Sequence, residues 1–242
     1  MKLIQLNIWA GRLNSPIEEF FQKQAADIYC LQEVIDIPGG QGELFTALEE
    51  IVELANLSSV YFSPAFGFNY DRRHGRLGNL IAAKQDFAST HHFFTSKEYN
   101  PNLDHILHDT NMRNLQHVTF ERPGDDLHVL NHHGYWVGEH KNGNKETLEA
   151  CQTIVDYISK LKGQVILCGD FNLAPHSDSI ELLNKALRNL SVEHRLQTTR
   201  TSLTHKREVC DYIFVNDSVK VKSFKALDSI VSDHKALVLE FD

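Results

Sequence analysis

Short apolar segments alternate with segments of helical periodicity along almost the whole chain. The apolar segments are at most nine residues long and rich in Val, Ile, Phe and Tyr, which predicts strands. Segment 27–34 is apolar on both faces, as expected of a buried strand. The predicted strands cover residues 2–9, 27–34, 59–64, 77–84, 87–95, 115–121, 127–132, 164–170, 208–215, 219–227 and 235–242.

Four segments predict helices. Segment 15–26 opens with a serine cap, a proline at the first helical position and a glutamate three residues after the cap. Segment 144–160 has apolar residues at helical spacing, and segment 43–55 is a further helix. We expect Ser177 to cap a fourth helix that ends near residue 190.

The order of these elements predicts the fold class. Several strands follow one another directly, as hairpins do, so pure βαβ alternation is absent and an α/β protein with mixed sheets is expected. Hydrophobic residues make up 42% of the chain and charged residues 23%, which is typical of a globular protein. Because predicted strands reach both termini, we expect one domain that covers residues 1–242.

The charge balance and the cysteines restrict the partners and the cellular compartment that the sequence predicts. The chain has 24 basic and 32 acidic residues, which disfavours a nonspecific duplex binder, although a metal ion or a local patch can reverse the field. No apolar run reaches the roughly 18 residues of a transmembrane helix, and the first residues lack the features of a signal peptide. Four cysteines in apolar segments, without a C-x-x-C pair, predict buried reduced thiols and a cytoplasmic location. No protein partner is evident.

Polar residues recur at the ends of the predicted strands, where loops present functional groups. They include carboxylates, amides and imidazoles, and one carboxylate lies inside an apolar run, where an unpaired charge is costly. Hard oxygen ligands suit Mg²⁺ or Mn²⁺, and imidazoles beside them suit proton transfer or contact with a phosphoryl oxygen. The set therefore indicates metal-assisted phosphoester hydrolysis; it comprises Asn7, Glu33, His133, Asp170, Asn172, Asp211, Asp233 and His234.

The order of these residues resembles the pattern of the endonuclease/exonuclease/phosphatase superfamily. The resemblance covers residues 7–234, and it implies a four-layer α/β/β/α sandwich of the DNase I type. In such a fold two mixed β-sheets lie face to face, with helices outside each. The matching motifs are Asn7, Leu31-Gln32-Glu33, Gly78-Asn79-Leu80-Ile81, Asn131-His132-His133, Gly169-Asp170-Phe171-Asn172, Asp211-Tyr212 and Ser232-Asp233-His234.

The resemblance also implies a role for each matching residue. Glu33, with Asn7 close by, would hold the metal ion, and Asp233 would bind the metal through water or support its ligands. Asp170 would orient and deprotonate the attacking water, and Asn172 would help to position that water and the phosphate.

Two histidines complete the implied site. His133 and His234 would contact phosphoryl oxygens and stabilise the charge that develops there. Asp211 would accept a hydrogen bond from His234, which would fix the tautomer of the ring and favour its protonated form.

Two features set the chain apart from the AP-endonuclease branch of the superfamily. Glu33 is followed by Val-Ile instead of Thr-Lys, and His133 is present. The chain is more similar to the branch with deoxyribonuclease I, sphingomyelinases, inositol-polyphosphate phosphatases, deadenylases and tyrosyl-DNA phosphodiesterases. Segment 131–138 followed by Lys141 resembles small members of that branch. The arginine that often begins their next helix is missing near Glu149.

Two segments are candidates for substrate contact, with a solvated surface as the alternative interpretation of each. Segment 66–76 mixes aromatic rings, which stack on bases, with arginines, which bind phosphates. Segment 135–145 is a candidate lip over the site. The candidate contacts are Arg72, Arg73, Arg76, Asn131, Trp136 and Lys141.

Three functional hypotheses follow. The first is a metal-dependent phosphodiesterase or nuclease, which acts on a nucleic acid or a small phosphorylated molecule. The second is a phosphomonoesterase, or a lipid phosphohydrolase of the sphingomyelinase or inositol-phosphate type, on the same scaffold. The third is a non-catalytic binding module, which the intact Asp170, Asn172 and His234 disfavour.

Overall fold

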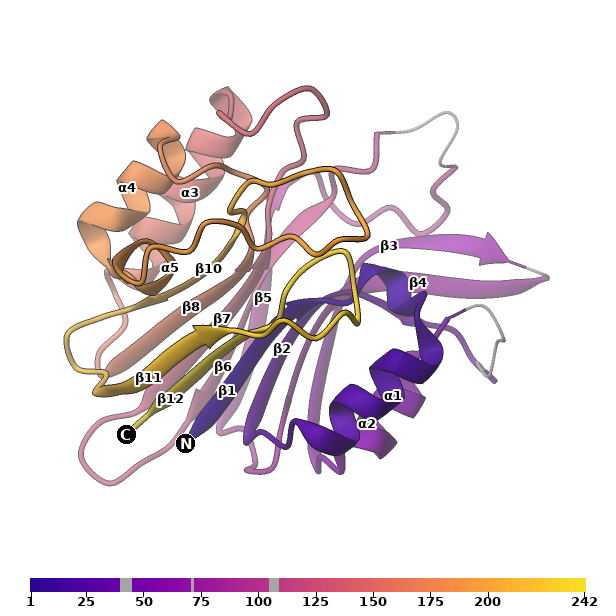
Figure 1. Cartoon of the computed structure of the whole chain (residues 1–242), viewed down its shortest axis with the longest axis horizontal. Coiled ribbons are helices and arrows are strands. Elements are labelled where there is room, and N and C mark those ends of the chain that lie inside the picture. Colours follow the sequence, from indigo (N-terminus) through magenta and orange to yellow (C-terminus); the bar gives the residue numbers. More distant parts are fainter. Residues whose placement is uncertain (40–44, 71, 105–108) are drawn as a thin grey trace.

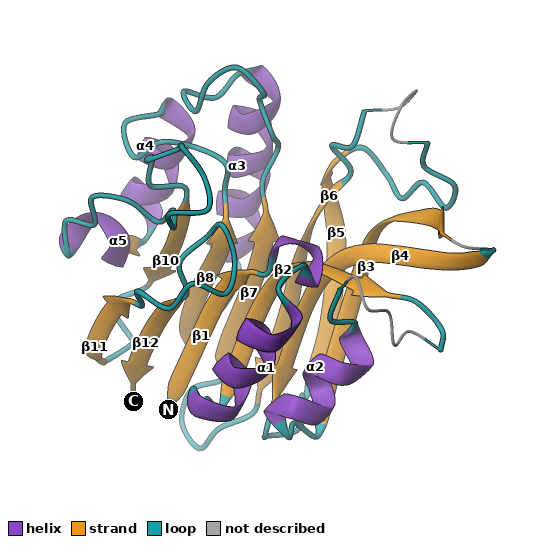
Figure 2. Cartoon of the chain, turned by 45° about the vertical axis from the view of Figure 1, so that its right-hand side comes forward, coloured by secondary structure: helices purple, strands orange, loops and turns teal. Residues whose placement is uncertain are grey.

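The chain folds around two six-stranded β-sheets that lie face to face (Figures 1 and 2). The computed structural model describes residues 1–39, 45–70, 72–104 and 109–242. The first sheet has the order β11-β12-β1-β2-β4-β3, and the second has the order β5-β6-β7-β8-β10-β9. In each sheet one pair of central strands is parallel, β1 with β2 and β7 with β8, while the other neighbours are antiparallel.

Twelve strands and five α-helices make up the described part of the chain. The first sheet contains β1 (Lys2–Asn7), β2 (Ile28–Asp36), β3 (Ser59–Tyr70), β4 (Arg73–Ala83), β11 (Val221–Ala226) and β12 (Leu237–Phe241). The second contains β5 (Ser89–Ser96), β6 (Arg113–Phe120), β7 (Leu127–His133), β8 (Gln164–Asp170), β9 (Arg188–Asn189) and β10 (Asp211–Val215). The helices are α1 (Asn14–Lys23), α2 (Leu48–Ala55), α3 (Lys145–Ile158), α4 (Asp178–Ala186) and α5 (Leu190–Glu193), and a 3-10 turn η1 spans Trp9–Gly11.

Period-two alternation in the strands creates the four layers. Leu3 of β1 joins the core between the two sheets, whereas the next residue, Ile4, packs against α1 and α2 outside the first sheet. Leu167 of β8 packs in the same way under α3 and α4, and the next residue, Cys168, faces the core between the sheets. The predicted α/β/β/α sandwich is confirmed, with α1 and α2 on one outer face and α3 and α4 on the other (Figure 2). Helix α5 follows the edge strand β9 and buries Leu190 in the core between the sheets.

Most predicted elements are present, and several of their boundaries differ. Residues 66–70 and 73–76, which lie between the predicted strands 59–64 and 77–84, extend β3 and β4 as a hairpin that pairs Tyr70 with Arg73. Helix α1 begins at Asn14, so Ser15 lies inside it and does not cap it. The predicted residues 43 and 44 of the second helix lie outside the described residues, and α2 begins at Leu48.

The fourth predicted helix begins as expected and ends early. Ser177 caps α4 by accepting a hydrogen bond from the backbone N–H of Ile180 at 3.3 Å. The helix ends at Ala186, before residue 190, because the chain turns into the short strand β9 that pairs with β10.

A belt of buried amide side chains joins the two sheets beneath one end of the sandwich. Gln32 donates from Nε2 to Oδ1 of Asn131 at 2.7 Å, and Gln5 donates to Oε1 of Gln32 at 2.9 Å. Asn131 donates in turn to the backbone carbonyl of Leu31 at 2.9 Å and to Oε1 of Gln116 at 3.2 Å. Such paired polar groups are tolerated in a core and fix the registry of the two layers.

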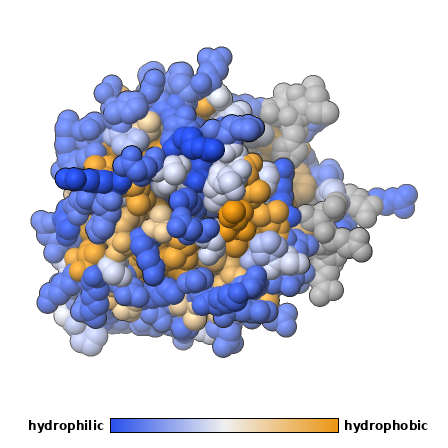
Figure 3. Space-filling model, viewed as in Figure 1, coloured by the Kyte–Doolittle hydropathy of each residue, from blue (hydrophilic) through white to orange (hydrophobic). Residues whose placement is uncertain are grey.

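The surface and the thiols agree with a globular domain. In the described segments, no helix is long and apolar enough to cross a bilayer. Figure 3 shows hydrophilic side chains along the outline of one face, with hydrophobic ones at the surface mainly in its middle. All four cysteines are buried and unpaired, as predicted.

Candidate active site

Strand direction brings the predicted site residues to one end of the sandwich. The parallel pairs β1–β2 and β7–β8 end there, while β6, β10 and β12 begin there. A cleft of about 310 Å³ opens at this end. It is lined by Trp9, Arg12, Glu33, Thr110, Arg113, His133, Trp136, Asp170, Asn172, Arg200, Lys206, Asp233 and His234. A larger hollow of about 480 Å³ along α4, β9 and α5 contains no imidazole.

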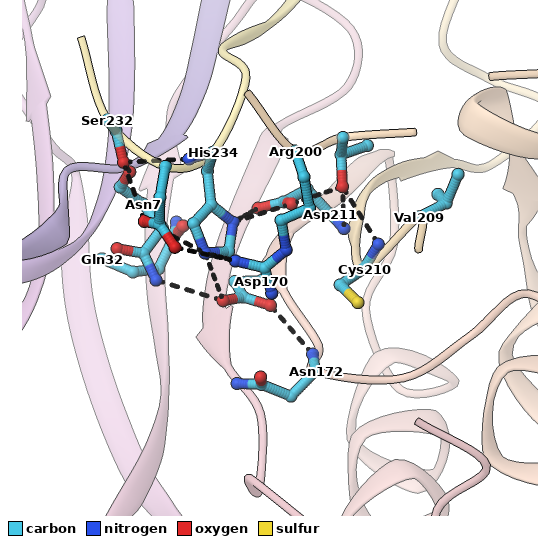
Figure 4. A network of polar contacts seen from close by, with 12 residues as sticks. Asn7, Gln32, Asp170, Asn172, Arg200, Val209, Cys210, Asp211, Ser232 and His234 are labelled. Carbon is cyan, nitrogen blue, oxygen red and sulfur yellow. Dashed lines mark hydrogen bonds and ion pairs between the residues drawn. The ribbon is translucent and has the colours of Figure 1, made fainter. Parts of the chain in front are cut away.

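Asp170 lies at the centre of the cleft, at the end of β8 (Figure 4). Its Oδ1 accepts from the backbone N–H of Asn172 at 2.9 Å, and its Oδ2 accepts from Nδ2 of Asn7 at 3.1 Å. Burial alone would raise the pKa of Asp170, but the positive charges of His234 and Arg200 outweigh burial and hold it well below its usual range. Asp170 is therefore a carboxylate at neutral pH.

The turn before and after Asp170 depends on backbone conformations that few residues adopt. Gly169 has a φ of +144°, and a Cβ atom at this position would lie 1.8 Å from the carbonyl oxygen of His132 on the neighbouring strand. Asn172 has a φ of +58°, a conformation that asparagine tolerates better than most residues. The Gly-Asp-Phe-Asn motif therefore sets the direction in which the two functional side chains leave the strand.

His234 faces Asp170 from the segment before β12, and Asp211 fixes its ring. Nδ1 of His234 donates to the Asp211 carboxylate at 2.9 Å, while Nε2 lies 3.5 Å from Oδ2 of Asp170. Asp211 also accepts from the hydroxyl of Thr199 at 2.6 Å. Burial would lower the pKa of His234, but Asp211 and Asp170 outweigh it and raise that pKa.

Glu33 reaches the cleft through an irregularity in β2. The pairing of β2 with β4 shifts between Leu31 and Val34, and Glu33 at this point has a φ of +56°. Bulges of this kind re-aim a side chain, and the strained conformation costs about 1–2 kcal/mol. Burial raises the pKa of Glu33, against the hydrogen bond that Oε1 accepts from Nδ2 of Asn7 at 3.0 Å.

His133 completes the group at the end of β7. Its Nε2 lies 3.9 Å from Oε1 of Glu33 and 3.9 Å from Oδ2 of Asp170. Burial lowers the pKa of His133 well below its usual value, and the charge of Arg113 adds to this effect. This imidazole is therefore neutral and can act as a donor of one hydrogen bond.

The donor set fits a hard divalent cation on the Glu33 side of the cleft. Ionisable atoms of Asp170, Asp211 and His234 lie within 4.8 Å of one another, but hydrogen bonds between Asp211 and His234 already occupy two of these residues. Glu33 and Asp233 offer carboxylate oxygens to the cleft instead. The amide oxygen of Asn7 accepts from the backbone N–H of Trp9, so its NH₂ group faces the carboxylates. Asn7 therefore orients Glu33 and Asp170.

The structure places some of the predicted substrate contacts at the cleft and others away from it. Trp136 lines the cleft, and buried Lys141 donates to Oδ1 of Asn172 at 2.7 Å. Asn131 belongs to the amide belt beneath the cleft. The three arginines of the β3–β4 hairpin do not line the cleft, and two of them have partners elsewhere: Arg73 donates to the carbonyl of Gly39, and Arg76 pairs with Asp36.

Sequence reasoning missed six residues that line the cleft: Trp9, Arg12, Thr110, Arg113, Arg200 and Lys206. Arg200 lies against His234, and Trp9 and Arg12 stack on each other at 4.9 Å beside Glu33. Trp9 follows Asn7 closely at a strand end, which is a usable signal. Arg200 lies in no motif and eleven residues from the nearest one in the sequence, so only the fold reveals it.

Comparisons with known proteins agree with this geometry. The model of the Endonuclease/Exonuclease/phosphatase family matches residues 4–234. A search of curated protein sequences finds no match.

Solved structures with the same fold cover the whole chain at low sequence identity. An endonuclease/exonuclease/phosphatase from Beutenbergia cavernae aligns with a TM-score of 0.75 at 16% identity over 100% of this chain and 71% of its own. A family protein from Leptotrichia buccalis aligns with 0.70 at 17%, over 100% and 99%. Bacteroides thetaiotaomicron mannosyl-6-phosphatase aligns with 0.68 at 18%, over 100% and 99%.

Proposed function

The chain belongs to the endonuclease/exonuclease/phosphatase family, and we propose that it is a divalent-metal-dependent phosphoester hydrolase. The observation that carries the proposal is the arrangement around Asp170. This carboxylate is buried, ionised and oriented by Asn7 and Asn172, and it faces a histidine whose tautomer Asp211 fixes. Such a set is suited to activate water beside a phosphoryl group.

In this proposal each side chain has one task. Asp170 orients a water molecule and accepts its proton as the water oxygen attacks phosphorus, and the ester P–O bond breaks. His234 and His133 donate hydrogen bonds to the phosphoryl oxygens, where negative charge increases in the transition state. Glu33 would hold Mg²⁺ or Mn²⁺, which supplies Lewis-acid polarisation of the phosphoryl oxygen when bound.

The surface of the cleft supports a small phosphorylated molecule better than a long nucleic acid. The net charge of the chain is −8, which disfavours a nucleic-acid backbone outside the cleft. The cleft volume of about 310 Å³ is at the lower end of ligand pockets. Among the described residues, the most exposed large hydrophobic side chains lie on different segments, which gives little support to action on a lipid surface.

The test is hydrolysis of a mixed panel by the wild type and Asp170→Asn, with Mg²⁺, Mn²⁺ or EDTA. The panel contains p-nitrophenyl phosphate, bis-p-nitrophenyl phosphate, single- and double-stranded DNA, RNA, sphingomyelin and an inositol phosphate. We expect metal-dependent turnover that falls by about 10²- to 10⁴-fold in Asp170→Asn. Asp228→Asn, at an exposed carboxylate paired with Lys235, is the matched control and should retain wild-type activity.

Two outcomes would contradict the proposal. Turnover that persists in EDTA would exclude the metal requirement. An absence of turnover with either metal, from protein with a cooperative thermal transition, would favour a non-catalytic binding module.

A further inference from the structure

Three buried cationic side chains lie at the cleft: Arg113 and Arg200 line it, and Lys141 binds Asn172, which lines it. Arg113 and Lys141 contact only neutral oxygens. Arg113 donates from Nε to the carbonyl of Gly134 at 2.7 Å and from Nη1 to that of Thr110 at 3.1 Å. Lys141 donates to Oδ1 of Asn172 at 2.7 Å. Within the described residues, neither forms an ion pair with a carboxylate. Buried Arg and Lys are almost always paired with an anion. Because these two are not, their charges remain available to an anionic ligand.

The third cation, Arg200, has a donor without an acceptor. A β-bridge with His234 places it, and the residue is only 4% exposed. Its Nη1 lies against Nε2 of His234 and 3.4 Å from Oδ2 of Asp233, whereas its buried Nε has no hydrogen-bond partner among the described residues. Figure 4 shows the guanidinium between His234 and Asp170. A phosphate oxygen in the cleft would supply the missing acceptor.

Building on the proposed function, we propose that Arg113, Lys141 and Arg200 bind a phosphate group with two negative charges, so that the enzyme prefers phosphomonoesters to phosphodiesters. A phosphomonoester presents a dianion and a single organic group. A phosphodiester presents one charge and two organic groups, so it gains less from three cations and has a second group to place in a cleft of about 310 Å³.

The reaction balances without a further reactant. The oxygen of water forms a bond to phosphorus, the P–O bond to the organic group breaks, and the alcohol leaves with a proton. Inorganic phosphate is the second product, and it keeps the charge that the three cations recognise. The proposal therefore also implies inhibition by inorganic phosphate.

The first experiment compares p-nitrophenyl phosphate with bis-p-nitrophenyl phosphate, because both release the same chromophore. We expect the wild type with Mg²⁺ to have the higher kcat/KM for the monoester. Arg200→Gln should lower kcat/KM for the monoester by about 10- to 100-fold and for the diester by much less, since a charge-assisted hydrogen bond to a dianion is lost. Arg200→Lys keeps the charge but lacks Nε, so its kcat/KM for the monoester should lie between those of the wild type and Arg200→Gln.

The second experiment measures binding without turnover. The only two tryptophans of the chain, Trp9 and Trp136, both line the cleft, so intrinsic fluorescence reports directly on its occupancy. Wild-type protein in EDTA is titrated with inorganic phosphate at pH 8, and in parallel with dimethyl phosphate. We expect phosphate to bind more tightly than dimethyl phosphate, and Arg200→Gln and Lys141→Gln to weaken phosphate binding at least severalfold.

A matched control and the thermal transition separate charge effects from misfolding. Arg188→Gln removes an exposed arginine that pairs with Glu193 along the other hollow, and it should leave phosphate binding and both activities as in the wild type. If Arg200→Gln does not fold, Arg200→Lys and Lys141→Gln carry the test.

The outcomes distinguish the two proposals. Equal losses for both esters in Arg200→Gln, or a wild-type preference for the diester, would overturn the dianion site and leave the hydrolase intact. Absence of metal-dependent turnover of either ester would overturn the hydrolase, whereas phosphate binding that depends on Arg200 would still support the anion site. Phosphate binding that is the same in all variants would overturn the anion site.

Discussion

Two buried histidines, His234 and His117, show how the partners of an imidazole decide its chemistry. His234 in the cleft is 3% exposed, and His117 on the outer face of the second sheet is 6% exposed, so burial is nearly the same. Two carboxylates, Asp211 and Asp170, lie beside His234 and raise its pKa. No carboxylate accounts for the pKa of His117, which burial and then His128 lower to about 4.

The partners of His117 form a one-way chain of neutral hydrogen bonds. The carbonyl of Lys162 can only accept, so Nε2 of His128 donates to it at 2.8 Å, and Nδ1 of His128 then accepts from Nε2 of His117 at 3.0 Å. Nδ1 of His117 is left to accept from the hydroxyl of Tyr157 at 2.8 Å. Burial thus keeps an imidazole neutral unless an anion is supplied, and the cleft is the place where the fold supplies one.

Among the tests of this contrast, the largest effect is expected from removing the charge of Asp211 beside His234. Asp211→Asn keeps the size of the side chain but not the charge that faces His234, so we expect kcat to fall by about 10- to 100-fold. The measurement is steady-state hydrolysis of the best substrate from the panel. A kcat within twofold of the wild type, with an unchanged thermal transition, would show that the charge of Asp211 does not set the chemistry of His234.

The next effect is on stability at low pH. The folded pKa of His117, about 4, lies below its usual value of 6.5. Between these values the unfolded chain binds a proton that the folded chain excludes, so this contribution to stability is complete above pH 6.5 and decreases as the pH falls toward 4. From pH 6.5 to 5 it amounts to about 2 kcal/mol.

Urea unfolding at pH 7.5, 6.5 and 5 measures this contribution. His117→Gln lacks the titrating ring, so its free energy of unfolding should fall by about 2 kcal/mol less than that of the wild type as the pH falls to 5. Parallel pH profiles of the two proteins would show that His117 is not held neutral by the fold.

The smallest expected effect comes from Tyr157, the first donor in the chain of hydrogen bonds through His117. Tyr157→Phe removes the hydroxyl that donates to His117 and keeps the ring that packs on Phe93 at 4.9 Å. We expect a loss of about 1 kcal/mol in the free energy of unfolding at pH 7.5 and no change in kcat. A fall in kcat would mean that the outer face and the cleft are coupled, which the contrast between the two histidines does not predict.

The sequence by itself determined the layers and most of the site. Strands with period-two alternation and helices with one apolar stripe can bury their apolar surface in few ways, and the ordered motifs from Asn7 to His234 narrowed these to one sandwich. Motif residues at strand ends were predictable because the carboxyl ends of parallel neighbours meet at one edge, as those of β7 and β8 do at His133 and Asp170.

Only the tertiary structure decided the electrostatics of the cleft. Arg200 contacts His234 across 34 positions of sequence, and no local pattern encodes that contact. The β3–β4 hairpin likewise carries Arg76 to Asp36, although its composition resembles that of a substrate loop. Spacing along the chain predicts which face a side chain occupies, but its charge partners come from segments brought together by folding, and these partners set its pKa and its availability to a ligand.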